Sequence, residues 1–595
     1  MKKIYGFAFA AAVMALASCS NDSEPVNNQN PVVDPDGVAG YIAVNIATPQ
    51  NSRSTNTVGD GGFALGEGKE NLIDNVKFVI LANDNGTYKV SYTIDKSTAA
   101  SDWKGPADFP NTVEMIGGTT LVIPNTAVNP NNTTTVDKVD PDMKLLVILN
   151  PGSISITNNM DEATLMSKVE AVTTDFSEAA SRFVMTNSSY ITTDESGNDV
   201  EVKAIKLDSK YLMATTGEAQ NNPVEVYVER AVARADYQLV GADQDSFYGK
   251  NDLYWNNNSG EKVTLVPEIQ AVAFFNNPDK TLLFKNISGW NSTWNGANDA
   301  ANFRSYWATM PETGITQPTY SFNEYVAANA WDGSSLKKDY IRENTYGAAD
   351  KKQTKVVVLA QLKEKKDDGT LGDAKDMACI FGQFTSKDGA AALVASTLRG
   401  LGYRVETTNY AADGSVESRE YRTINYTNDS KELAYTGLAV AGNDIDDTYA
   451  VEEGKGNRTY LKLNITLGAN ERLVKENGVK PNTTEVNWEA ATEDEINALL
   501  KKDYAISYWN NGLCYYYTDI EHLKFGQDDA NPGVVRNHVY QINFNGINGF
   551  GTPIFDPDKK LIPTKPEYNE GENVFLAAHI NVLRWKVVSN NVILE

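Results

Sequence analysis

The first residues whose types could do chemistry stand near the N-terminus, in the string Leu16-Ala17-Ser18-Cys19. They end an apolar run, Ile4–Ala17, that follows two lysines. The run is too short to span a bilayer but suits the apolar region of a signal peptide. A cysteine here is typical of a bacterial lipobox, in which the Cys19 thiol is lipidated and the residue becomes the mature N-terminus. A plain signal peptide that happens to contain a cysteine is the alternative. We therefore predict a lipoprotein signal peptide over residues 1–19.

A second chemical feature is an isolated basic side chain. Arg53 is the only basic residue between Lys3 and Lys69, and it lies in a segment rich in Pro, Asn, Ser, Thr and Gly. Because proteolytic cuts concentrate in exposed loops, this arginine is expected to be a good substrate for a trypsin-like protease. Residues 20–39, which precede this region, are polar, contain proline and show no apolar period, which predicts a flexible tether.

The stretch before the cut has the alternation of a short strand. Ile42, Val44 and Ile46 fall on one face, and Tyr, Ala and Asn fall on the other. We predict that residues 40–53 are a removable first strand with its cleavage loop. An ordinary edge strand that stays in place is the alternative.

Other kinds of chemistry leave no clear motif. His522, His538 and His579 lack the spacing of zinc ligands, and we expect hydrogen-bonded structural histidines, with no metal and no cofactor. The chain has no Gly-x-Ser-x-Gly, Walker or Gly-x-Gly-x-x-Gly signature. The 78 acidic residues leave a glycosidase pair open, because that pair is defined by a separation in space. Cys379 and Cys514 are too few for a disulfide framework, and we expect both to be buried and inert.

The elements that must position these residues are mostly strands. Short apolar or alternating runs separated by Gly, Asn, Asp and Pro predict strands over Val76–Leu81, Lys89–Ile94, Thr119–Ile123, Leu145–Leu149, Val224–Val228, Lys262–Val266, Thr281–Phe284, Val356–Leu362, Tyr460–Leu467, Val539–Phe544 and Val574–Val588. Helices are expected over Met160–Val172, after Ser386 and after Thr492.

This pattern predicts a mainly β fold of β-sandwiches with a few short helices. A length of 595 residues favours two domains, which we place at residues 54–270 and 271–595. A net charge of −25 disfavours nucleic acid as a partner, because its phosphates would be repelled. Four tryptophans between Trp290 and Trp331 could form a platform that stacks on sugars, but strand-rich proteins commonly use aromatic residues in their cores.

Several strings, taken in order, resemble a known family. They are the Cys19 lipobox and tether, YIAVNIATPQNSR ending at Arg53, FVMTNSSY at 183–190, VEVYVERAVARADY at 224–237, NFRSYWA at 302–308, GVVRNHVYQINFNGINGFGTP at 533–553 and the final INVLRWKVVSNNVILE. Together they resemble the fimbrillins, the type V pilus subunits of Bacteroidales-type bacteria, and most of all the stalk subunit of the short, or minor, fimbriae. The resemblance touches both predicted domains and both termini.

The resemblance implies transthyretin-like β-sandwich domains and a non-enzymatic, structural role. It implies a precursor that is lipidated, delivered to the outer membrane surface and cut between Arg53 and Ser54 by an arginine-specific protease, so that the first strand leaves. The C-terminal strand of an identical subunit then fills the vacated groove, and Val588, Val592 and Leu594 are the candidate donor residues. Accessory tip and anchor pilins, and host or bacterial receptors contacted in adhesion and biofilm formation, are the other implied partners.

Two different functions share some of these features. A surface glycan-binding lipoprotein would keep its first strand and expose an aromatic platform. A secreted glycoside hydrolase would hold a carboxylate pair in a cleft.

Overall fold

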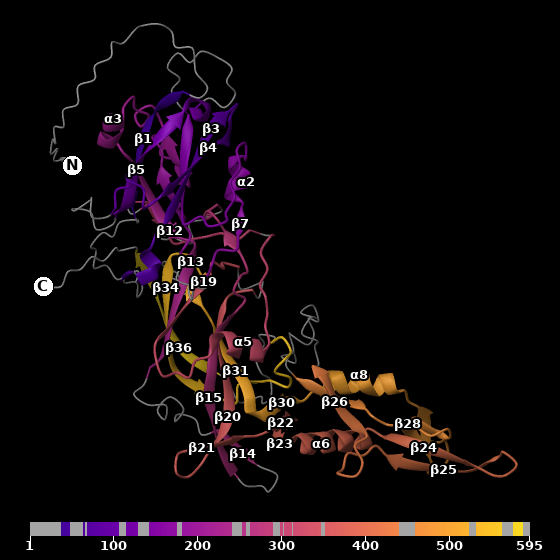
Figure 1. Ribbon diagram of the computed structural model, residues 1–595. Coiled ribbons are helices and arrows are strands. Elements are labelled where there is room, and N and C mark those ends of the chain that lie inside the picture. The colour runs from indigo at the N-terminus through magenta and orange to yellow at the C-terminus, as the bar shows by residue number, and fades with distance from the viewer. Residues whose placement is uncertain are drawn as a thin grey trace, which may run out of the picture.

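A computed structural model describes residues 37–47, 63–65, 68–105, 115–128, 142–174, 181–240, 253–256, 262–288, 298–300, 303–311, 313–346, 352–438, 458–522, 531–561 and 575–586. The fold is mainly β, as the sequence predicts, with short helices on the outside of several sheets (Figure 1). The predicted signal peptide and residues 20–36 of the predicted tether lie outside the described residues, while Val38 and Ala39 at the end of that tether already belong to the first strand.

Within the described residues the chain forms two β-sheet systems and a projecting lobe. The first system is an eight-stranded sheet in the order β4-β3-β6-β8-β12-β1-β5, with β11 paired to β6. Its two ends share one hydrophobic cluster, so the sheet folds back on itself as a sandwich. Its strands are β1 (Val38–Ala47), β3 (Asn75–Asp84), β4 (Thr87–Ser97), β5 (Met115–Pro124), β6 (Met143–Leu149), β8 (Met185–Asn187), β11 (Ile205–Leu207) and β12 (Val224–Arg230). Around it lie η1 (Gly68–Asn71), α1 (Asn125–Val128), α3 (Thr216–Asn221), the hairpin β9 (Tyr190–Thr193) and β10 (Asp199–Val202), and the pair β17 (Asn298–Asp299) and β18 (Arg304–Ser305).

The second system consists of two sheets, β19-β13-β34-β36-β2 and β14-β15-β20-β31-β35 with β21, whose inner residues share a second cluster. The first sheet contains β2 (Phe63–Leu65), β13 (Val232–Leu239), β19 (Lys337–Arg342), β34 (His538–Asn548) and β36 (Phe575–Lys586). The other contains β14 (Leu253–Asn256), β15 (Lys262–Phe275), β20 (Lys355–Lys365), β21 (Leu371–Ala374), β31 (Leu513–Asp519) and β35 (Thr552–Pro553), with α5 (Phe322–Asn329) and the pair β32 (Glu521–His522) and β33 (Asn531–Pro532) beside them.

A third part of the chain projects sideways from the foot of the second system, in orange tones in Figure 1. This lobe has its own hydrophobic cluster beneath two helices, α6 (Lys387–Gly400) and α8 (Glu493–Asp503). Its strands are β22 (Met377–Ile380), β23 (Gln383–Thr385), β24 (Tyr403–Tyr410), β25 (Val416–Thr423), β26 (Leu433–Leu438), β27 (Thr459–Leu463), β28 (Glu471–Val479), β29 (Val486–Ala490) and β30 (Ser507–Trp509), which ends at η6 (Asn510–Gly512).

Local capping explains the two helices of the lobe. The Ser386 hydroxyl accepts a hydrogen bond from the Gly389 N–H, and the Thr492 hydroxyl accepts one from the Glu495 N–H, so each helix begins where the sequence predicts.

The helix expected over Met160–Val172 is much shorter than predicted. It is confined to α2 (Glu162–Met166), and the chain then extends into β7 (Val169–Glu170), which pairs with β16 (Thr281–Leu282). The long-range pairing overrides the local helical period. The strands expected over Thr281–Phe284 and Tyr460–Leu467 likewise end early, at Leu282 and Leu463, whereas the strand expected to end at Val266 continues to Phe275.

The chain passes from the first core to the second through one continuous strand segment, β12 followed by β13. Val232 belongs to the first cluster and Ala233 to the second, while Leu283 and Phe284 return to the first. The two cores are therefore not two consecutive stretches of chain, and the domain boundary near residue 270 stays a prediction.

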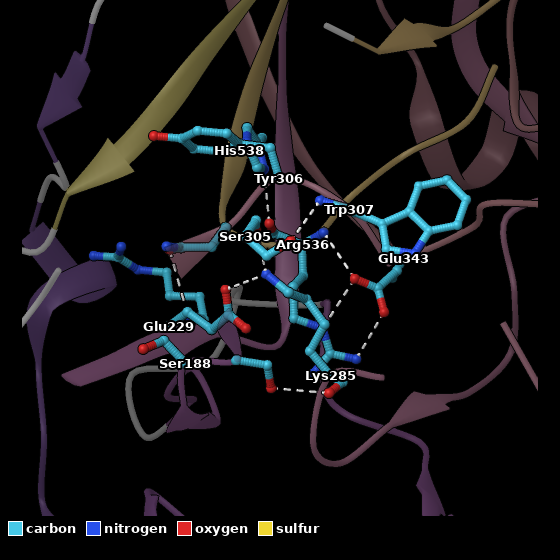
Figure 2. Close-up of polar contacts among 12 residues, drawn as sticks. Ser188, Glu229, Lys285, Ser305, Tyr306, Trp307, Glu343, Arg536 and His538 are labelled. Carbon is cyan, nitrogen blue, oxygen red and sulfur yellow. Dashed lines mark hydrogen bonds and ion pairs between the residues drawn. The ribbon is translucent and has the colours of Figure 1, made fainter. Parts of the chain in front are cut away.

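Buried ion pairs tie the two systems together at this crossing (Figure 2). The Arg536 guanidinium, which is fully buried, donates to both oxygens of Glu343 at 3.1 and 3.0 Å. It also donates to the carbonyl oxygens of Leu282 and Leu283. Beside it, the Lys285 ammonium donates to Glu229 Oε2 at 2.8 Å and to the Ser305 carbonyl oxygen at 2.6 Å. These contacts hold together five segments of the chain, around Glu229, residues 282–285, Ser305, Glu343 and Arg536.

A second buried cluster lies where η1 meets β13. Arg234 donates to both oxygens of Glu70 at 2.9 and 2.8 Å and to Asp236, and the Tyr340 hydroxyl donates to Glu70 at 2.7 Å. The nearby Arg230 guanidinium donates to the Glu70 carbonyl oxygen, and burial lowers its pKa to about 9. The segment that follows the predicted cleavage loop is therefore anchored in the interior.

The histidine pair lies close to the same crossing. His522 contacts the Tyr540 hydroxyl and the Tyr306 carbonyl oxygen, both at 2.9 Å, and its ring centre is 4.8 Å from that of His538. Burial lowers the pKa of His522 to about 3 and that of His538 well below its usual 6.5. Both side chains are therefore neutral in the folded protein at physiological pH.

We expect Arg536→Met to lower the free energy of unfolding by about 3–5 kcal/mol, because Glu343 would remain buried without its partner. Denaturation followed by tryptophan fluorescence measures the change. Lys480→Met is the control, since the Lys480–Glu485 pair is exposed and should contribute less than about 1 kcal/mol. The double variant with Glu343→Leu should recover part of the loss. An Arg536→Met protein as stable as the parent would contradict the role given to this pair.

The free energy of unfolding should also decrease as the pH is lowered from about 6.5 to 5. An unfolded histidine binds a proton near pH 6.5 whereas His522 in the folded protein does not until about pH 3, so the unfolded state binds more protons in this window. The stabilisation is complete above pH 6.5 and is lost as the pH falls, by up to about 1.4 kcal/mol per pH unit for each such histidine. Thermal melts across this range measure the slope, and His522→Gln should flatten it. An unchanged slope in the His522→Gln protein would contradict the conclusion that His522 is neutral in the folded state.

Candidate functional site

The first strand of the described chain occupies an interior position in the first sheet. β1 pairs antiparallel with β5 along nearly its whole length, from Val38 opposite Pro124 to Ala47 opposite Met115. On its other edge it pairs parallel with β12, from Val44 opposite Val224 to Ala47 opposite Tyr227. In Figure 1 β1 lies next to β5 at the top of the molecule. Its backbone groups are therefore used on both edges.

The aliphatic face of β1 is buried completely. Ile42, Val44 and Ile46 have no exposed surface, and they belong to the first hydrophobic cluster together with Leu121 and Val226 of the flanking strands. Each such side chain contributes roughly 1.5–3 kcal/mol when it leaves water. The position of β1 is thus a hydrophobic slot with strands for walls; we call it the β1 slot.

Both walls of the β1 slot have attachments other than β1. β12 pairs with β8 through Val228–Arg230. β5 exchanges two backbone hydrogen bonds with Lys104, through Gly118, at 2.7 and 2.9 Å. Trp103 lies directly over Gly117, where an added Cβ atom would come within 2.3 Å of its ring. The walls therefore remain attached to the rest of the domain through contacts that do not involve β1.

The end of the slot near Tyr41 is closed by the segment between β11 and β12. Tyr41 exchanges both backbone hydrogen bonds with Met213, at 2.8 and 3.0 Å, on the edge opposite β5. Helix α3 follows at once, packs against β1 and lies beside it in Figure 1. Thr215 and Glu218 form a capping box that fixes the start of α3.

At the other end of the chain, the strand expected over Val574–Val588 is β36, Phe575–Lys586. It pairs antiparallel with β34, from His538 opposite Arg584 to Asn548 opposite Phe575. On its other edge β36 pairs parallel with the short strand β2. β2, which the sequence pattern did not indicate, is the first described element after Arg53. A segment that follows the predicted cleavage site and a segment close to the C-terminal end therefore lie side by side in one sheet.

Several predicted site residues are not placed. Cys19, Arg53, Ser54, Val588, Val592 and Leu594 lie outside the described residues. Their roles stay predictions, as does the removal of β1.

Other candidate sites gain no support from their surroundings. No group of three or more His, Cys, Asp or Glu side chains is arranged to hold a metal ion within the described ranges. Cys379 and Cys514 are both buried, and burial raises the pKa of the Cys514 thiol to about 12. Trp331 is buried and packs edge-to-face on Tyr237, which is core packing rather than an exposed platform. In the part of the chain that is described, no helix is long and apolar enough to cross a membrane.

The sequence contains a signal for the buried ion pairs, namely charged residues within an apolar segment. The string VEVYVERAVARADY places Glu229, Arg230, Arg234 and Asp236 within an otherwise apolar double strand. Charged residues there must be paired or exposed.

Known structures show a distant similarity to the chain. A proposed cell adhesion protein from Parabacteroides distasonis has 10% identity and a TM-score of 0.34, with 93% of this chain and 99% of the other covered. A similar protein from Bacteroides eggerthii has 11% identity, a TM-score of 0.28 and the same coverage. The tip fimbrial protein Mfa3 from Porphyromonas gingivalis, truncated at its C-terminus, has 11% identity and a TM-score of 0.25, with 56% and 80% covered. No curated protein matches the chain.

The sequence of the C-terminal part matches a family model. Residues 507–591 match the model described as major fimbrial subunit protein type IV, fimbrillin, C-terminal. This segment runs from β30 through β31 and β34 to β36, and it contains one of the strings from which the resemblance was drawn. Over these residues the chain is similar to the C-terminal domain of the fimbrillins, which are major fimbrial subunit proteins.

Proposed function

We propose that the chain is a pilin that polymerises by exchange of strands. The observation that supports this most is the position of β1. A strand close to the N-terminus fills an interior place in a sheet, and its two walls are anchored to the domain through other contacts. Such a strand can be replaced by another extended segment without rebuilding the sandwich.

Processing would convert the subunit from closed to open. The precursor is exported as a lipoprotein through Cys19, reaches the outer membrane surface, and is cut between Arg53 and Ser54 by an arginine-specific protease. Loss of β1 would expose the sockets of Ile42, Val44 and Ile46 and two rows of backbone hydrogen-bonding groups. Exposed rows of this kind readily pair with another chain.

The incoming strand would come from the C-terminal end of an identical subunit. Val588, Val592 and Leu594 alternate along that end, with Asn590 at the remaining position, and they would refill the aliphatic sockets. A donor and an acceptor on different surfaces of one subunit would make a heterologous contact, which would propagate as a filament. A subunit that both donates and accepts suits the stalk. Accessory tip and anchor pilins would complete the fimbrium, and receptors on host or bacterial surfaces would be contacted in adhesion and biofilm formation.

Changing Arg53→Ala should leave a folded, soluble monomer, because β1 would stay in the slot. Limited proteolysis with trypsin, N-terminal sequencing and gels run in mild SDS measure the outcome: the parent should start at Ser54 and form ladders, and the variant should do neither. Ser54→Ala keeps the arginine and serves as the matched control. Normal ladders from the Arg53→Ala protein would refute processing at this residue.

Deleting residues 588–595 should abolish the ladders while leaving the fold and the cut intact. A finer test places a charge at Val592, because an aspartate in an apolar socket would be desolvated without a partner. Val592→Asp should reduce polymer yield about tenfold or more, whereas Asn591→Asp, on the other face of the same strand, should change it little. Electron microscopy before and after trypsin treatment gives the yield. Equal filaments from both variants would show that Val592 does not enter a core.

A further inference from the structure

The β1 slot has one place where no side chain fits. Gly40 lies two residues before Ile42, on the same side of β1, and it is buried. A Cβ atom added there would lie 2.8 Å from Leu212 Cδ1 and 2.8 Å from the Met213 carbonyl oxygen. That oxygen accepts the hydrogen bond from the Tyr41 N–H, so it cannot retreat without loss of the pairing at this end.

The segment that forms this restriction is held firmly. Tyr211 is tied by its N–H to the Asp208 carbonyl oxygen, and the Asn222 side chain donates to the Lys210 carbonyl oxygen on the far side of α3. Leu212 also packs against the first hydrophobic cluster. The segment from Asp208 to Pro223, which we call the collar, is therefore closed on itself and presents Leu212 toward Gly40 as a fixed wall.

The outward face of the slot is restricted as well. Ala43 and Ala47 point away from the core, yet they are only 5% and 7% exposed. Helix α3 packs against β1, and its Ala219 is fully buried. Gln220 of the same helix donates to Thr120 of β5 across the slot. At the level of Ala43 this cover leaves room for a small side chain only, whereas Tyr41 and Asn45 on the same face are partly exposed.

We propose that the collar makes the slot selective: its occupant must place no side chain at the level of Gly40, aliphatic side chains at the core positions, and a small side chain at the level of Ala43. The inference rests on the strand exchange proposed above, and the occupant is the extended donor segment of a second copy of this chain. Because residues 588–595 contain no glycine, this donor would fill the slot from the level of Ile42 and stop short of Gly40. Hydrophobicity alone would not admit a strand, because a β-branched residue facing Leu212 is excluded by shape. Gly40 and Leu212 are the positions that decide selection.

The test uses the full chain after trypsin cleavage, with the new start at Ser54 checked by sequencing. Fluorescent peptides covering residues 38–47 are added, and binding is followed by anisotropy. The parent peptide, a Gly40→Val peptide and an Ala39→Val peptide are compared. Ala39→Val adds the same side chain one position away, on the opposite face. We expect Gly40→Val to weaken binding by about tenfold or more and Ala39→Val by less than about threefold.

A complementary variant of the protein provides the second measurement. A Cβ atom at position 40 meets the Leu212 side chain and the Met213 carbonyl oxygen, and Leu212→Ala removes the first of these. This variant should therefore restore about threefold or more of the binding lost by the Gly40→Val peptide. It should change the binding of the parent peptide less. If the parent peptide binds and Gly40→Val binds equally well, the selective collar is refuted while the strand exchange stands. If no peptide binds the processed chain, the exchangeable slot itself is refuted.

Discussion

The structure depends on backbone pairing at one interior position of a sheet. A strand between two others satisfies hydrogen-bonding groups on both edges, and a vacancy there leaves two rows unpaired above an open apolar core. β1 meets this requirement with ten residues, of which the first two, Val38 and Ala39, fall within the expected tether. The strands on either side, β12 and β5, are tied to β8 and Lys104. Any extended segment that fits between these two strands could therefore satisfy their backbone groups.

The buried ion pairs connect one wall of the β1 slot to the second system. β12 forms one wall of the slot, and its final residues, Glu229 and Arg230, enter the polar interior where the two systems meet. Charges removed from water in this way contribute little net stability compared with apolar packing, but they permit few alternative arrangements. Through these contacts the wall of the slot is connected to the system that contains β36.

Sequence reasoning recovered what is encoded locally. The alternation of Ile42, Val44 and Ile46 gave a strand with one apolar face, and the capping residues Ser386 and Thr492 gave the starts of two helices. Prediction from the sequence failed where contacts between distant segments decide the local structure. The apolar period after Met160 is helical in isolation, but Val169 pairs with Leu282. Arg536 and Glu343 are 193 residues apart, and no local pattern joins them. The restriction at Gly40 likewise depends on Leu212, which lies far along the chain.

The projecting lobe between β21 and β31 has a consequence of a different kind. It is built around its own cluster of apolar residues and stands at the opposite end of the molecule from β1 and β5 (Figure 1). Its loops can therefore change in length and composition without disturbing the packing of the two sandwiches. The lobe is a suitable place for a foreign epitope in an engineered variant.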